Sequence, residues 1–147
     1  MPTNADPLLF DTSAAVAFVD AEHPFHDQVW SAAASRSRGL SGHAVFEFIS
    51  VLTRLPVPKR LSGADALRLM RSEFPDNRFL PGDAMDALAD EFTDAGIAGG
   101  MVYDGLVGAC ARYHGRALVT CDRRAEEVYR LLGTDYVLIG AAGKSTT

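Results

Sequence analysis

Four acidic residues stand out in this sequence because each has a setting that suits a metal-binding carboxylate. Asp11 and Asp122 each follow a short apolar run that predicts a buried strand. Glu47 is the one acid in a strongly apolar helical segment, and Asp104 lies between two glycines of another predicted helix. Carboxylates gathered at one place provide oxygen ligands for Mg²⁺ or Mn²⁺. The chemistry they suggest is metal-assisted hydrolysis, in which a cation activates a water for attack on phosphorus.

Each acid also has an ordinary structural interpretation. Asp11 and Asp122 precede predicted helices, where a carboxylate can cap the free N–H groups. Asp104 lies near a helix N-terminus, where the helix dipole stabilises a carboxylate by about 0.3–1 kcal/mol. Glu47 shares a polar stripe with Ser50, which is typical of a solvated helix face. For each acid taken alone, both interpretations stay open.

The glycines around Asp104 favour a binding role. Gly100 and Gly108 lie one helical turn before and after it, and glycine costs a helix about 1 kcal/mol relative to alanine. We expect the missing side chains to leave open space beside the carboxylate for an ion or a phosphate. Thr120 lies two residues before Asp122 and points to the same side if the strand continues.

Short apolar strands alternate with helices along the chain, which predicts an α/β sandwich with a mostly parallel sheet. Strands are expected at 8–10, 78–80, 117–120 and 136–139, and helices at 14–19, 24–35, 43–55, 83–94, 101–113 and 122–132, with another after a Ser62 cap. Trp30 and Met85 are expected to face inward. Sites in such sheets form at the carboxyl ends of the strands, where both Asp11 and Asp122 are expected.

Length and composition indicate one globular domain, residues 1–140, with 141–147 as a loose tail. The net charge of −5 excludes a simple basic protein that coats phosphates. Cys110 and Cys121 form no C-x-x-C pair, so neither a zinc cage nor a disulfide framework is indicated. Free thiols are typical of a reducing, cytoplasmic setting, and we expect neither a signal peptide nor a membrane span.

Convergence of the four acids would require a cation. Two carboxylates about 4 Å apart repel each other by about 4 kcal/mol at an effective dielectric constant of about 20. Oxygen-only ligands favour Mg²⁺ or Mn²⁺ over zinc. Such an ion would also allow an acidic protein to cleave an acidic polymer.

The segments that contain the acids resemble those of a PIN domain, and in particular of a VapC-type toxin ribonuclease of a type II toxin–antitoxin system. They are residues 8–13 (LLFDTS), 46–47 (FE), 99–107 (GGMVYDGLV) and 118–124 (LVTCDRR). The resemblance runs in order through nearly the whole chain. One segment alone is weak, but four acids in this order make a strong match.

The resemblance implies a PIN-like three-layer sandwich and a Mg²⁺- or Mn²⁺-dependent endoribonuclease, a hydrolase. Asp11, Glu47, Asp104 and Asp122 match the acidic site of the family one by one. By this match, Asp11, Asp104 and Asp122 are expected to bind the metal directly. Glu47 is expected either to bind it through water or to orient the attacking water.

The resemblance also implies partners and neighbouring groups. Ser13 and Thr120 match hydroxyls beside the acids and are expected to orient the carboxylates, although capping and strand roles explain them equally well. A cognate antitoxin that blocks the site, a homodimer and an RNA substrate are expected. Neither the RNA that is cut, nor the number of metal ions, nor the antitoxin contacts follow from the sequence, and DNA cleavage is not excluded.

Basic and aromatic residues near the acids are candidates for RNA contacts. Arg123 and Arg124 directly follow the last acid, so they are the best candidates for phosphate contacts, with ordinary surface as the alternative. Tyr103 and Trp30 have the ring faces on which bases stack, but core packing is the better interpretation for Trp30.

Other titratable residues carry weaker signals. Glu126 and Glu127 are candidates for the additional acid that some PIN domains have, and a solvated helix face explains them as well. His23 and His26 have a spacing that could bind metal, but no further ligand pattern completes such a site.

Three other classes of protein fit this pattern less well. A haloacid dehalogenase-type phosphatase needs a second Asp two residues after the first, where this chain has Ser13. A phospho-receiver domain needs a late lysine after a strand, and neither Lys59 nor Lys144 fits. A non-catalytic PIN-like binding subunit remains the alternative, although the presence of all four acids argues against it.

Overall fold

The structure is a computed structural model that describes residues 6–140, so the expected tail at 141–147 lies outside the described residues. Its elements are β1 (Leu8–Phe10), α1 (Thr12–Val19), α2 (His26–Ala33), β2 (Arg38–Leu40), α3 (Ala44–Thr53), α4 (Gly63–Glu73), α5 (Gly82–Ala95), α6 (Met101–Tyr113), β3 (Ala117–Thr120), a short 3₁₀ helix η1 (Arg123–Ala125), α7 (Glu126–Leu131) and β4 (Tyr136–Leu138). Among the described residues, no helix has both the length and the apolar character needed to cross a membrane.

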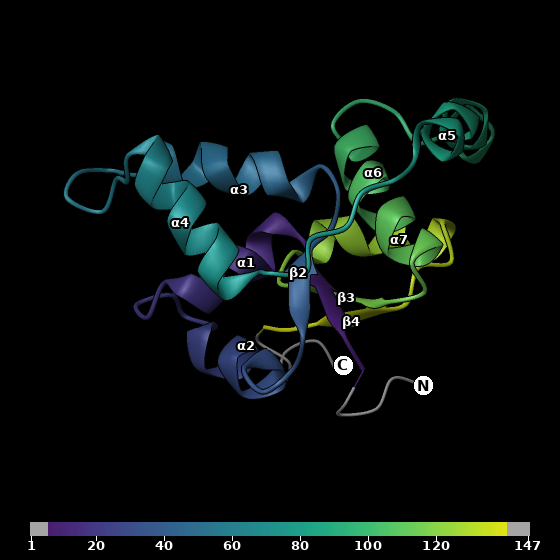
Figure 1. Cartoon of the computed structure of the whole chain (residues 1–147). Helices are drawn as coiled ribbons and strands as arrows, with labels where there is room; N and C mark the ends of the chain where they lie inside the picture. Colours follow the sequence, from purple (N-terminus) through teal and green to yellow (C-terminus); the bar gives the residue numbers. More distant parts are fainter. Residues whose placement is uncertain (1–5, 141–147) are drawn as a thin grey trace.

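The described strands form a four-stranded, all-parallel sheet in the order β2-β1-β3-β4 (Figure 1). Leu9 of β1 pairs with Gly39 of β2 on one side and with Leu118 of β3 on the other. Parallel neighbours need crossover connections, and the helices between the strands provide them. The predicted α/β sandwich with a parallel sheet is therefore confirmed.

Helices cover both faces of the sheet and produce three layers (Figure 1). Successive residues of a strand point to opposite faces. Leu8 and Phe10 accordingly pack in a cluster with α1, α2, α3 and α4, whereas Leu9 packs with Leu118 against α6 and α7. Helix α5 packs outside α6 through a smaller cluster that includes Leu88.

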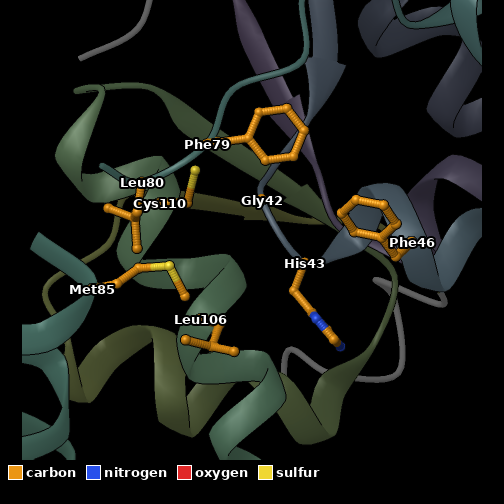
Figure 2. Close-up of a pocket in the computed structure, with 8 residues that line it drawn as sticks. All are labelled: Gly42, His43, Phe46, Phe79, Leu80, Met85, Leu106 and Cys110. Carbon is orange, nitrogen blue, oxygen red and sulfur yellow. The ribbon is translucent and has the colours of Figure 1, made fainter. Parts of the chain in front are cut away.

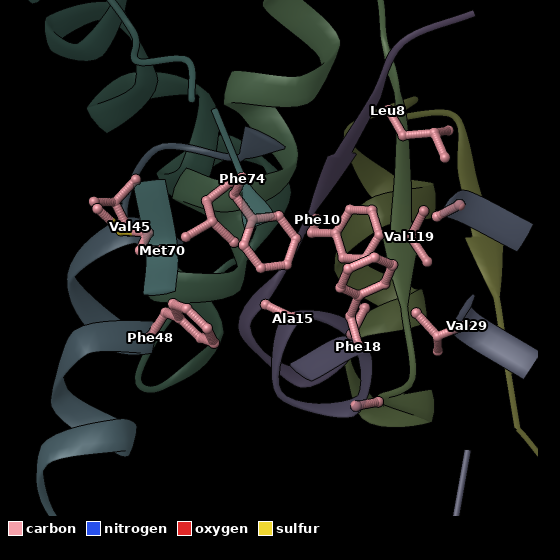
Figure 3. Packing of buried hydrophobic residues seen from close by; sticks show 14 of the residues in the cluster. Leu8, Phe10, Ala15, Phe18, Val29, Val45, Phe48, Met70, Phe74 and Val119 are labelled. Carbon is pink, nitrogen blue, oxygen red and sulfur yellow. The ribbon is translucent and has the colours of Figure 1, made fainter. Parts of the chain in front are cut away.

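Aromatic rings at the centre of the first cluster fix the helices that flank the acids (Figure 3). The ring centroid of Phe10 lies 5.7 Å from that of Phe18 in α1 and 5.1 Å from that of Phe74. Phe48 of α3 contacts Phe74 edge-on, with centroids 5.6 Å apart. Phe10 directly precedes Asp11, and Phe48 directly follows Glu47. The packing of these rings therefore fixes the start of α1 and the start of α3 relative to strand β1.

Some predicted elements differ from the structure. Residues 38–40 form β2, which the sequence analysis missed, and the predicted strand at 78–80 is wrong, since only a single bridge joins Arg78 to Ser41. The helix expected at 122–132 is split into η1 and α7. The prediction that Trp30 and Met85 face inward is also wrong, because both are 47% exposed. Trp30 nevertheless stacks on Phe18, with ring centroids 4.8 Å apart.

Candidate active site

The carboxyl ends of β1 and β3 bring two of the acids to one edge of the sheet. Asp11 follows β1 directly, and its backbone N–H donates to the carbonyl of Val119 in β3, at 3.1 Å. Asp122 comes two residues after Thr120, the last residue of β3. Because these two strands are neighbours in the sheet, the two carboxylates meet at the edge where ligands bind in parallel α/β folds.

Asp11 is buried and held by three hydrogen bonds. Its Oδ1 accepts from the hydroxyl of Ser13 at 2.6 Å and from the backbone N–H of Ala14 at 3.1 Å, so it also caps α1. Its Oδ2 accepts from the hydroxyl of Tyr129 at 2.9 Å. Burial raises the pKa of Asp11, and these donors oppose the rise because they stabilise the carboxylate. The side chain is thus fixed, with one lone pair of Oδ2 left for another partner.

Hydroxyl groups join the two strand ends. Besides its bond to the first acid, Ser13 Oγ accepts from the N–H of Cys121 at 2.9 Å. Thr120 Oγ1 accepts from the N–H of Asp122 at 3.1 Å and lies 3.4 Å from Ser13 Oγ. The two hydroxyls therefore lie beside the acids, and they fix the backbone from which Asp122 projects.

Glu47 and Asp104 come from the first turns of α3 and α6. Glu47 Oε1 accepts from the hydroxyl of Thr12 at 3.1 Å, which ties α3 to the residue after Asp11. The pKa of Asp104 is raised from 3.8 to about 6, first by burial and then by the negative charges of Asp122, Asp11 and Glu47. All four acids therefore lie close enough to interact, although they are spread over the chain.

The donor set fits a hydrated divalent cation better than a closed cage. In the described part of the chain, no three Asp, Glu, His or Cys side chains lie close enough to hold an ion by themselves. Mg²⁺ usually keeps several waters and is bound by one or two carboxylates. Four mutually repelling carboxylates, one of them with a pKa of about 6, are stabilised when such an ion is bound. The roles of the individual acids as metal ligands stay predictions.

The two arginines after the last acid differ in their contacts. Arg124 donates from its backbone N–H and from Nε to Asp122 Oδ1, at 2.9 and 3.2 Å, and its side chain is 92% exposed. Its positive charge partly offsets the raised pKa of Asp104. Arg123 is exposed to solvent. Both remain candidates for RNA contacts.

Tyr129 is a site residue that the sequence analysis missed. It is fully buried on α7 and reaches Asp11 across a separation of 118 residues. Its ring fills the space beside Gly108, where an added Cβ would lie 2.8 Å from the ring. The expectation that Gly108 leaves open space for an ion is therefore wrong. At Gly100, by contrast, an added Cβ would have no atom within 4 Å, so the space there is open. The only sequence signal for Tyr129 is its place on the buried face of the 122–132 segment.

The other candidate residues make local contacts or lie at the surface. His23 Nδ1 accepts from the N–H of Phe25 at 3.0 Å, and His26 Nδ1 donates to the carbonyl of Ala17 at 2.8 Å. Both rings therefore use one nitrogen locally. Glu126 accepts from the hydroxyl of Tyr136 at 2.8 Å, and Glu127 is exposed.

An apolar pocket lies between the start of α3 and helices α5 and α6 (Figure 2). It is lined by Gly42, His43, Phe46, Phe79, Leu80, Met85, Leu106 and Cys110. Burial raises the pKa of the Cys110 thiol, whose sulfur donates to the carbonyl of Arg78. The thiol therefore stays protonated and is a poor nucleophile.

A parallel three-layer sandwich with four acids at the carboxyl edge of its sheet is the arrangement expected of a PIN domain. The sequence model of the PIN domain family matches residues 8–131. The chain belongs to this family.

Relatives in the family are named as ribonucleases. Ribonuclease VapC27 of Mycobacterium tuberculosis is 38% identical over 132 residues, which are 90% of this chain and 96% of the relative. Ribonuclease VapC40 of the same species is 35% identical over 133 residues, which are 88% of this chain and 96% of the relative.

Solved structures share the fold. VapBC2 from Rickettsia felis, bound to a DNA fragment from its promoter, contains a chain that matches with a TM-score of 0.65 and 14% identity, over 91% of this chain and 99% of that one. FitAcB from Neisseria gonorrhoeae matches with a TM-score of 0.62 and 16% identity, over 88% and 95%.

Proposed function

We propose that this protein is the toxin of a type II toxin–antitoxin pair, a divalent-metal-dependent endoribonuclease that hydrolyses RNA phosphodiester bonds. The observation that carries the proposal is the placement of the acids at one edge of the sheet: Asp11 and Asp122 follow the neighbouring strands β1 and β3, and Glu47 accepts a hydrogen bond from Thr12, the residue after Asp11. The relatives named VapC ribonucleases, which align over nearly the whole chain, support the same activity and substrate.

In this proposal Asp11, Asp104 and Asp122 would hold Mg²⁺ or Mn²⁺ together with water molecules, since the described side chains do not close around an ion by themselves. When bound, the ion supplies charge neutralisation at the phosphate and activates water. Oδ1 of Asp11 already accepts from two donors and Oδ2 from one, so Oδ2 would be the oxygen available to the ion. Glu47, oriented by the Thr12 hydroxyl, positions the attacking water and receives its proton. Tyr129 and Ser13 keep the Asp11 carboxylate in one orientation.

The proposal includes a cognate antitoxin and a second copy of the chain as protein partners. Structures of VapBC toxin–antitoxin complexes share the fold, which supports a cognate antitoxin as partner. A homodimer is supported by the exposed apolar side chains around the pocket in Figure 2, among them Phe46, Phe79 and Met85, which are 63%, 50% and 47% exposed. Exposed apolar patches of this kind are typical of contact surfaces between proteins.

The experiment that tests the activity is cleavage of a mixed pool of structured RNAs by the purified protein, freed of antitoxin, with Mn²⁺ or with EDTA. Asp104→Asn is the inactive variant, and Asp83→Asn, at an exposed position at the start of α5, is the matched control. We expect metal-dependent cleavage by the wild type and by Asp83→Asn but not by Asp104→Asn. Equal cleavage by all three proteins would contradict the assigned site, and folded proteins that are all inactive would favour the non-catalytic binding subunit.

A further inference from the structure

An open groove extends from the acidic edge toward the turn between α1 and α2. Thr12 and Ser13 line its inner end, together with Asp122. His23 and Phe25 line its outer end, and Arg124 flanks it. The groove has a volume of about 410 Å³, within the range of about 300–1,000 Å³ that ligand sites occupy. It is therefore large enough for one nucleotide, and it starts at the carboxylates that would cleave the strand.

His23 has a defined donor at this groove. Its Nδ1 accepts a hydrogen bond from the N–H of Phe25 at 3.0 Å. A ring nitrogen that accepts carries no proton, so the proton of the neutral ring lies on Nε2. The half-buried imidazole thus offers an N–H donor, while its other nitrogen holds the turn that leads into α2.

Arg124 has a second set of donors at the same groove. Its Nε and its backbone N–H are both directed to Asp122 Oδ1, which anchors the near end of the guanidinium. The side chain is 92% exposed, so its terminal amino groups face solvent. Guanidinium groups bind phosphate through two parallel hydrogen bonds, which makes arginine well suited to this role.

We propose that this groove binds the RNA nucleotide next to the scissile phosphodiester, with the phosphate of that nucleotide between His23 Nε2 and the guanidinium of Arg124. The inference rests on the proposed ribonuclease function. A polyanion that approaches four carboxylates is repelled by them, and donors along the groove oppose this repulsion beside the site. Phe25 provides an apolar wall for the sugar or base of the same nucleotide.

The test compares two substitutions that separate the nitrogens of His23. In His23→Asn the side-chain oxygen can replace Nδ1 as the acceptor for Phe25, but the Nε2 donor is lost. In His23→Gln the side-chain amide N–H reaches the place of Nε2. For Arg124→Ala the charge-matched control is Arg68→Ala, whose guanidinium pairs with Asp65 on the surface of α4. All four are made in the inactive Asp104→Asn protein.

The measurement is fluorescence anisotropy with a short labelled single-stranded oligoribonucleotide at several salt concentrations. We expect His23→Asn and Arg124→Ala each to weaken binding about tenfold, and His23→Gln and Arg68→Ala to stay within about twofold of the parent. Affinity for RNA falls as the salt concentration rises. Loss of Arg124 should make this dependence less steep, by about 0.7 in the slope of log affinity against log salt concentration. Unchanged thermal unfolding of each variant excludes misfolding.

Two results separate the possible failures. In the first, the wild type cleaves RNA, but His23→Asn and Arg124→Ala bind RNA like their parent, or Arg68→Ala weakens binding as much as Arg124→Ala does. The groove assignment is then wrong, and the nuclease function stands. If the wild type neither cleaves nor binds RNA, the proposed function fails and the groove assignment fails with it.

Discussion

Replacing Asp104 by asparagine is expected to stabilise the metal-free protein while it abolishes activity. The pKa of Asp104 is raised from 3.8 to about 6, chiefly by burial and then by the charges of Asp122, Asp11 and Glu47. One pKa unit corresponds to about 1.36 kcal/mol, so ionising this carboxyl costs about 3 kcal/mol more in the folded protein than in the unfolded chain. Because the side chain is only partly buried, solvent screening reduces this to about 1–2 kcal/mol.

The pH dependence of this effect has a definite sign. Below about pH 3.8 the carboxyl is protonated in both the folded and the unfolded protein, so it costs no stability. Between pH 3.8 and about 6 it ionises in the unfolded chain but not in the folded one, and the wild type loses stability as the pH rises. Above about pH 6 the full cost is present, and asparagine removes it.

The assay is thermal unfolding in EDTA at about pH 7.5 and about pH 3.5. For a domain of this size 1 kcal/mol shifts Tm by about 2–4 °C, so we expect Asp104→Asn to raise Tm by about 3–6 °C at the higher pH and not at the lower one. Saturating Mn²⁺ should reverse the order, since an ion at a hundred times its Kd stabilises the wild type by about 2.7 kcal/mol. A gain that persists at low pH, or no gain at either pH, would refute the argument that burial and the neighbouring acids raise the pKa of Asp104.

Three further changes test other parts of the structure. Tyr129→Phe should lower the affinity for Mn²⁺ about 10- to 100-fold, because it removes the donor that orients Asp11, whereas Tyr136→Phe should leave titration calorimetry with Mn²⁺ unchanged. Gly39→Ala should prevent normal folding, measured by circular dichroism and yield, because its Cβ would lie 1.8 Å from a backbone carbonyl oxygen. Phe74→Ala should cost about 3–5 kcal/mol in urea denaturation, since this ring is fully buried among other rings; a loss under about 1 kcal/mol would contradict the described core.

The elements that the sequence predicted best are those with strong local patterns. The strand at 8–10 is an apolar run and that at 117–120 is apolar up to Thr120, and α6 has the bounds 101–113 that its flanking glycines indicated. β2 could not be predicted, because its centre is Gly39, a poor strand former. That glycine is required by a neighbour distant in sequence: the backbone carbonyl of Asp76 lies against it.

The candidate site shows the same division between local and distant information. The sequence marked the four acids because each has an unusual local setting, and it marked Ser13 and Thr120 through the strand ends. It could not mark Tyr129, since the phenol acquires its role only when α7 packs against α6 at Gly108. The open space expected there is filled by this ring, which no periodicity in the sequence reveals.

The most direct test of a single metal site is a Mn²⁺ titration of the wild type and of four variants, Asp11→Asn, Glu47→Gln, Asp104→Asn and Asp122→Asn, with Asp83→Asn as control. If the four acids form one site, each of the four substitutions weakens the same binding event, and the control binds like the wild type. Binding that survives all four substitutions, or that falls equally in the control, would contradict the metal site at this edge of the sheet.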